Sequence, residues 1–95
     1  MKYSYPAVFS PDKDGWYSVI FPDVPGCLTC GSTLNESIAM AEDALTLILH
    51  EYELDNTPVP TTSDPASIEA EENEIIRLIQ VDTANATGNE SDSKQ

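Results

Sequence analysis

The sequence contains two cysteines, Cys27 and Cys30, in the spacing C-x-x-C. This spacing occurs in structural zinc sites and in dithiol redox motifs. Zinc normally takes four Cys or His ligands, and the only other candidate is His50, the single histidine of the chain. A redox cysteine is activated at a helix N-terminus, whereas the helix predicted below begins after Thr33. We therefore expect two free cysteines that point to opposite faces of a strand, with no metal and no cofactor.

Three aspartates, Asp12, Asp14 and Asp23, lie near a predicted hairpin loop and in the segment after it. Nuclease sites with two metal ions need several carboxylates that converge from strands, but the predicted first strand, Tyr3–Phe9, has no acidic residue. Loop aspartates usually form turns. Nothing in the sequence supplies His50 with a nucleophile or an orienting partner. We predict no catalytic residue and no enzyme activity, and a degenerate metal-dependent nuclease is a remote alternative.

Charge is the strongest global signal. Seventeen Asp and Glu residues against four Lys and Arg residues give a formal net charge of −13. Such a field repels phosphate backbones, so we expect no direct binding to DNA or RNA. It attracts a basic protein and speeds the encounter with it. The alternative is that the charge serves solubility alone.

Length and composition predict one small domain followed by a tail. A chain of 95 residues is of a size that forms a single core. Residues 82–95, DTANATGNESDSKQ, have no large apolar side chain to offset the entropy of folding. We therefore place the domain at 1–81 and a disordered polar and acidic tail at 82–95. There is no signal-peptide h-region and no run near the roughly 18 apolar residues of a membrane span, which predicts a cytoplasmic protein without membrane contact.

Hydrophobic periodicity predicts the strands around these groups. Tyr3–Phe9 and Trp16–Phe21 alternate in hydrophobicity, which is typical of a β-hairpin with a loop of about five residues. Pro6 suits an edge, or a position without a ladder partner for its nitrogen. Residues 27–32 predict a short third strand. The run EIIRLIQV, residues 74–81, predicts a fourth because it is short and rich in β-branched residues.

The clearest local pattern is a helix that begins after Thr33 and ends near Leu54. Thr33 and Glu36 form a capping box, T-x-x-E. Apolar residues then follow on one helical face: Leu34, Ile38, Ala41, Leu45, Ile48 and Tyr52. A short helical turn is expected around Ser67–Glu71. The order β-β-β-α-β indicates an α+β domain with one sheet and the main helix packed on one face.

The stretch FPDVPGCLTCGSTLNESIAMAEDAL, preceded by YPAVFSPDKDGWYSV, resembles the N-terminal domain of HicB antitoxins. Fifteen positions carry the family's pattern: Tyr5, Ala7, Asp14, Gly15, Trp16, Phe21, Pro22, Asp23, Pro25, Gly26, Cys27, Thr29, Gly31, Thr33 and Glu36. Ser37 replaces the usual alanine. The resemblance covers residues 3 to about 81 and is specific over residues 3–54.

This resemblance implies a partial ribonuclease H-like fold that lacks the acids of the nuclease site. HicB proteins bind and inhibit HicA, a small basic toxin that cleaves mRNA, and they usually oligomerise. It therefore implies an antitoxin that covers the RNA-binding and active face of a HicA-like toxin, and a homo-oligomer. Many HicB proteins continue into a DNA-binding domain, for which the fourteen residues after Val81 are too few, so operator binding is not expected. The alternative is a stand-alone HicB-like regulatory or scaffold module without a toxin.

The residues singled out are predicted to make contacts and not to catalyse. Four are expected to present an acidic, aromatic-edged patch to a basic partner: Asp12, Asp14, Trp16 and Asp23. The alternative is that Trp16 is core and the aspartates only shape turns. Eight motif residues are expected to be structural: Pro22, Pro25, Gly26, Cys27, Thr29, Gly31, Thr33 and Glu36. Met40 and Leu47 lie seven apart outside the main stripe, beside Asp43, and form either a second contact ridge or a chance scatter.

Overall fold

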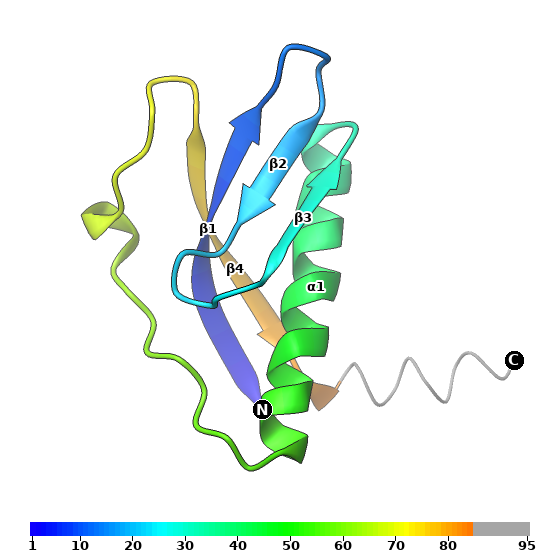
Figure 1. Ribbon diagram of the computed structural model, residues 1–95, viewed down its shortest axis with the longest axis vertical. Helices are drawn as coiled ribbons and strands as arrows, with labels where there is room; N and C mark the ends of the chain where they lie inside the picture. Colours follow the sequence, from blue (N-terminus) through cyan, green and yellow to red (C-terminus); the bar gives the residue numbers. More distant parts are fainter. Residues whose placement is uncertain (85–95) are drawn as a thin grey trace, which may run out of the picture.

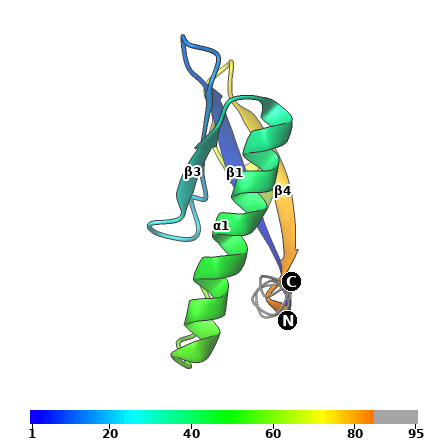
Figure 2. The same ribbon diagram turned by 90° about the vertical axis from the view of Figure 1, so that its right-hand side faces the viewer.

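The computed structural model describes residues 1–84, which form one sheet and one long helix (Figure 1). The elements are β1 (Lys2–Pro11), β2 (Tyr17–Ile20), β3 (Leu28–Gly31), α1 (Leu34–Leu54), the short 3-10 helix η1 (Pro65–Ser67) and β4 (Ile75–Asp82). The strands pair antiparallel in the order β3-β2-β1-β4. α1 covers one face of this sheet (Figure 2). The predicted α+β fold and its β-β-β-α-β order are confirmed. Within residues 1–84, no helix is long and apolar enough to cross a membrane.

The hairpin of β1 and β2 supplies much of the core. Tyr5, Ala7 and Phe9 of β1 and Val19 of β2 are buried in the cluster that packs against α1. The predicted alternation is confirmed, because successive side chains of a strand point to opposite faces of the sheet. β1 is an interior strand, but β2 pairs only with its last four residues. Pro6 therefore lies where β1 has only β4 beside it, which suits a residue without a backbone N–H.

α1 begins and ends where the sequence predicts. Thr33 Oγ1 accepts a hydrogen bond from the Glu36 backbone nitrogen at 3.0 Å. The Glu36 carboxylate reaches back to Ser32, one residue before the cap, and accepts from its nitrogen at 2.6 Å and its hydroxyl at 2.5 Å. These bonds lower the pKa of Glu36. The fully buried positions of the helix are Ser37, Ala41, Leu45 and Leu49. Ile48 and Tyr52, which were predicted on the buried stripe, lie at its border and are half-buried.

The connection from α1 to β4 returns past the sheet on the side away from the helix (Figure 1). The Tyr5 hydroxyl donates a hydrogen bond to the Pro60 carbonyl at the start of this connection. The short helical turn is η1, which lies earlier than the predicted 67–71. Asp64 caps it by accepting from the Ala66 nitrogen at 3.0 Å. The turn starts at Pro65 because proline presets the φ of a first helical position and lacks the N–H that would be left unpaired there.

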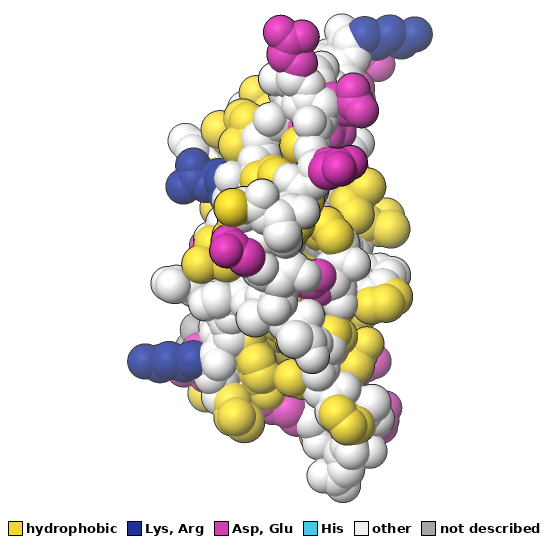
Figure 3. All heavy atoms as spheres, turned by 90° about the vertical axis from the view of Figure 1, so that its left-hand side faces the viewer, with side chains coloured by type: hydrophobic (Ala, Val, Ile, Leu, Met, Phe, Trp, Pro, Cys, Tyr) yellow, Lys and Arg dark blue, Asp and Glu magenta, His cyan; other side chains and the backbone are white. Residues whose placement is uncertain are grey.

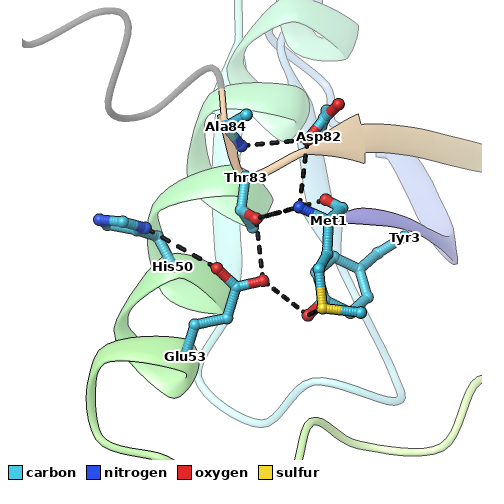
Figure 4. Close-up of polar contacts among 7 residues, drawn as sticks. All are labelled: Met1, Tyr3, His50, Glu53, Asp82, Thr83 and Ala84. Carbon is cyan, nitrogen blue, oxygen red and sulfur yellow. Dashed lines mark hydrogen bonds and ion pairs between the residues drawn. The ribbon is translucent and has the colours of Figure 1, made fainter.

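The fold extends past the predicted boundary at residue 81. β4 includes Asp82, and the Thr83 side chain is buried. Thr83 Oγ1 donates to Glu53 Oε2 at 2.9 Å, and the Tyr3 hydroxyl donates to the same oxygen at 2.7 Å (Figure 4). The Met1 ammonium donates to Thr83 Oγ1 at 3.0 Å. This network closes the end of the sheet onto the C-terminal turn of α1. The rest of the predicted tail, residues 85–95, lies outside the described residues.

Candidate functional site

The motif FPDVPGC between β2 and β3 folds as two successive turns. The Val24 nitrogen donates to the Phe21 carbonyl at 3.0 Å, and the Cys27 nitrogen donates to the Val24 carbonyl at 3.1 Å. Each turn has a proline at its second position, where proline presets φ. Gly26 holds the third position of the second turn with φ of 82°, a conformation for which a type II turn selects glycine. These residues set the direction in which the edge strand β3 leaves the loop.

Gly31 ends β3 directly beneath the first turn of α1. A Cβ atom built on Gly31 would lie 2.6 Å from the Ser37 backbone nitrogen and 2.7 Å from Ser37 Cα. Ser37 itself is buried, and its hydroxyl donates to the Leu34 carbonyl at 2.7 Å. The T-x-G-x-T part of the motif therefore combines a close strand–helix contact at its glycine with the helix cap at Thr33. The sequence predicted the helix cap at Thr33, whereas the close contact between Gly31 and Ser37 could be found only in the folded structure.

Asp12 shapes the hairpin loop. Its Oδ1 accepts hydrogen bonds from the backbone nitrogens of Asp14 at 2.9 Å and Trp16 at 3.1 Å. Gly15 in the same loop has φ of 90°, which favours glycine. The Asp12 carboxylate therefore stabilises the loop, which agrees with the interpretation that this aspartate shapes a turn. Asp14 and Trp16 are exposed, so the alternative that Trp16 is a core residue is wrong.

The structure does not bring all four predicted contact residues together. Asp12, Asp14 and Trp16 precede β2, whereas Asp23 follows its other end. Asp23 Oδ2 accepts from the Ser63 backbone nitrogen at 2.6 Å, and its Oδ1 accepts from the Ser63 hydroxyl at 2.8 Å. Both oxygens of Asp23 are therefore used to hold the connection after α1 against the β2–β3 loop. A role of these four residues in contacting a partner stays a prediction.

Trp16, Ile20 and Leu28 form an apolar surface on the sheet face that α1 does not cover, here named the outer β2–β3 patch. Ile20 and Leu28 are directly paired across the two strands, which places both side chains on the same face. All three side chains are exposed, Leu28 the most at 67%. The neighbouring hairpin loop carries two acids, Asp12 and Asp14, and one cation, Lys13.

A second apolar surface runs along one flank of α1. Met40, Leu47 and Leu54 lie seven residues apart, and Leu47 and Leu54 are 62% and 68% exposed. Two shallow hollows lie beside them. One of about 230 Å³ is lined by Ala44, Leu47, Ile48 and Glu51; the other, of about 210 Å³, is lined by Ile48, Glu51, Tyr52, Asp55 and Thr57. The hollows share Ile48 and Glu51, and we name them together the α1 groove. Met40, Leu47 and Leu54 form the ridge of this surface. The sequence indicated its first two residues, Met40 and Leu47, but not its continuation to Leu54.

The two surfaces differ in their charge. α1 contains no Lys or Arg, and Glu51 and Asp55 line the α1 groove. The cations of the described residues are Lys2, Lys13, Arg77 and the N-terminal ammonium. Figure 3 views the side of the molecule away from α1, and Lys and Arg side chains lie on this side. The acids that line the α1 groove therefore have no Lys or Arg of the same helix beside them.

The two cysteines differ in burial as expected, but Cys27 ends the turn before β3 and does not lie on the strand with Cys30. Cys27 is buried and Cys30 is exposed, and both are free. Burial raises the pKa of the Cys27 thiol to about 11, so its reactive thiolate is scarce at neutral pH. Within residues 1–84, no group of three or more His, Cys, Asp or Glu side chains is placed to hold a metal ion. His50 Nδ1 lies 4.0 Å from Glu53 Oε1, at the far end of α1 from the cysteines.

The sequence comparisons agree with the motif. The family described as HicB_like antitoxin of bacterial toxin-antitoxin system matches residues 5–92. A protein from Photorhabdus laumondii subsp. laumondii, Antitoxin HicB 2, is 40% identical over 90 residues, which cover 86% of this chain and 64% of that protein. The chain thus spans less than two thirds of the length of this relative.

Two solved structures share the fold. One, a toxin-antitoxin complex from Streptococcus pneumoniae, has a chain that matches with a TM-score of 0.83 and 23% identity, over 90% of this chain and 73% of that one. The other, a HicA3 and HicB3 toxin-antitoxin complex, matches with a TM-score of 0.67 and 23% identity, over 84% of this chain and 99% of that one.

Proposed function

Because the chain belongs to the HicB-like antitoxin family, we propose that it is the antitoxin of a type II toxin-antitoxin pair. It binds a small basic HicA-like toxin that cleaves mRNA, and it neutralises that toxin by covering its RNA-binding and active face. The observation that carries this proposal is the family match over nearly the whole chain, residues 5–92. Two solved structures with this fold, both toxin-antitoxin complexes, support it.

The charge of the chain supplies a physical basis for inhibition. A net charge of −13 attracts a basic toxin over a distance set by ionic strength and speeds its capture. The same field repels mRNA, so a toxin held by this chain is also shielded from its substrate. Apolar side chains exposed on α1, those of Met40, Leu47 and Leu54, provide contact area that charge alone does not. In this role the protein acts as an inhibitor and not as an enzyme.

We also propose that the chain forms a homo-oligomer. Within residues 1–84, the sheet ends on one side at β4, whose outer edge has no strand beside it. An edge strand of this kind can pair with an edge of a second chain. Light scattering coupled to gel filtration tests this directly: a single species with the monomer mass at micromolar concentration would contradict it.

The test of the antitoxin proposal uses a HicA-like protein, sought among the genes beside that of this chain. The two proteins are co-expressed, and we expect them to co-purify and the toxin's growth arrest to be relieved. A catalytically inactive variant of the toxin allows binding to be measured without cleavage. If the pair forms no complex and growth is not rescued, the antitoxin proposal fails. A genomic neighbourhood without any small basic HicA-like reading frame would favour the alternative, a stand-alone regulatory or scaffold module.

A further inference from the structure

We infer that the α1 groove, and not the outer β2–β3 patch, is the surface that receives the basic toxin. The inference rests on the proposed antitoxin function and adds to it the location of the contact. The occupant it assigns is a segment of the toxin that combines apolar side chains with Lys or Arg. Three features of α1 carry it: an exposed apolar ridge, two hollows beside the ridge, and acids without a cation on the same helix.

The ridge is too regular and too exposed to belong to the core of this domain. Seven residues make nearly two helical turns, so Met40, Leu47 and Leu54 line up along one side of α1. The core positions Ala41, Leu45 and Leu49 lie on another side and are fully buried. At 62% and 68% exposure, Leu47 and Leu54 bury only a minor part of their apolar area on folding, whereas burial of the rest by a partner would stabilise a complex.

The hollows give the ridge a shape that a partner side chain can enter. Ala44 has a small side chain, which leaves room between Leu47 and Ile48 in the first hollow. Tyr52 and Thr57 complete the second hollow where α1 passes into the connection. Ile48 and Tyr52 form an apolar floor at the border of the buried face. An apolar anchor set in such a depression is the usual centre of a protein interface.

The acids around the groove select the charge of the partner. Glu51 lines both hollows and Asp55 lines one, while Asp43 lies about one turn before Leu47 of the ridge. Because α1 contains no Lys or Arg, a second copy of this chain packed symmetrically on the groove would bring like charges together, which is unfavourable. A basic partner would pair with these acids. The outer β2–β3 patch is less selective for the charge of a partner, since Lys13 lies in the hairpin loop beside it.

The experiment compares four single variants for binding to the inactive HicA-like toxin by calorimetry. Leu47→Asp and Glu51→Lys change the α1 groove, and we expect each to weaken binding by about tenfold or more. Glu51→Lys also places a cation near the C-terminus of α1, where the helix dipole favours it, so its loss of binding would not reflect a damaged fold. Circular dichroism and thermal melting check each variant.

Two matched control variants make the same substitutions as the groove variants at positions outside the α1 groove. Glu42→Lys makes the same substitution on the opposite side of α1, because nine residues from Glu51 make about two and a half turns. Leu28→Asp repeats the apolar-to-acid change on the outer β2–β3 patch. We expect both to bind within about threefold of the unmodified chain.

The outcomes separate the two proposals. Loss of binding in Leu28→Asp with unchanged binding in Leu47→Asp and Glu51→Lys would overturn the assignment to the α1 groove and leave the antitoxin function intact. Loss of equal size in the groove variants and in Leu28→Asp would also overturn it, because the contact would not be confined to α1. If the unmodified chain does not bind the toxin, the antitoxin function fails.

Discussion

Asp23 accepts two hydrogen bonds from Ser63, at 2.6 Å from its backbone nitrogen and 2.8 Å from its hydroxyl. The first residue lies in the loop between β2 and β3, and the second in the connection that follows α1. The pair therefore joins two irregular segments that are 40 residues apart in the sequence. An aspartate that belongs to the family's motif is thus explained by the fold, before any partner is considered.

The Asp23–Ser63 contact should contribute to stability. Hydrogen bonds to a charged group are worth about 1.5–3 kcal/mol, and partial exposure of the pair reduces this. We expect Asp23→Ala to lower the free energy of unfolding in urea by about 1–2 kcal/mol. Ser63→Ala should cost less, because the backbone hydrogen bond remains. In the double variant the two effects should not add. Asp14→Ala is the control, and an equally large effect of that exposed residue would contradict the interpretation.

Gly31 should not tolerate even a methyl group. A Cβ at this position would lie 2.6 Å from the Ser37 nitrogen, so β3 or the first turn of α1 would have to move. Forcing an atom into a packed contact usually costs about 1–3 kcal/mol, and we expect Gly31→Ala to lower the free energy of unfolding by that amount. Cys30→Ala, at the exposed neighbouring position, should change it little. A Gly31→Ala variant with unchanged stability would show that the two elements separate easily.

The contribution of Glu53 to stability should depend on pH. Hydrogen bonds, first from Tyr3 and then from Thr83, lower the pKa of Glu53 in the folded protein, and the bond to Glu53 raises the pKa of Tyr3 to about 12. A carboxylate with a depressed folded pKa adds stability above its unfolded pKa of about 4.3 and loses it as pH falls through the folded value. We expect Glu53→Gln to be less stable than the unmodified chain at pH 7, measured by urea unfolding.

The difference between Glu53→Gln and the unmodified chain should close as the solution is acidified below about pH 4. Glu72→Gln makes the same change in net charge at an exposed loop position, and its stability should follow the unmodified chain at every pH. Tyr3→Phe should reduce the pH-dependent part of the free energy of unfolding without changing the net charge. A stability difference for Glu53→Gln that is the same at pH 7 and at low pH would contradict the network's role.

The two thiols should differ in reactivity. Cys30 is exposed, whereas burial protects Cys27 and raises its pKa to about 11. We expect Ellman's reagent at pH 8 to modify one thiol of the native protein quickly and the second only in denaturant. Cys30→Ser should abolish the quick reaction. Two quickly reacting thiols, or none before reduction, would contradict the burial of Cys27 or the free state of the pair.

Local interactions explain what the sequence could predict. The limits of α1 follow from Thr33, Glu36 and the apolar spacing, and all of these act within a few residues along the chain. The strands of the hairpin follow from alternation, and the β2–β3 turns from their prolines and from Gly26. The family motif covers the same local features, which is why the α+β order, the helix cap and the free cysteines could be predicted without coordinates.

Tertiary structure alone decided how these elements work together. It placed β1 inside the sheet, carried β4 to Asp82 and buried Thr83, and joined Asp23 to Ser63 and Glu53 to Tyr3. It also separated Asp23 from the hairpin loop, and it turned Met40 and Leu47 from an ambiguous spacing into a ridge beside two hollows. These features depend on residues 30 to 82 positions apart or on the solvent exposure of one helix flank. No local pattern encodes either, because the geometry exists only once the chain has packed.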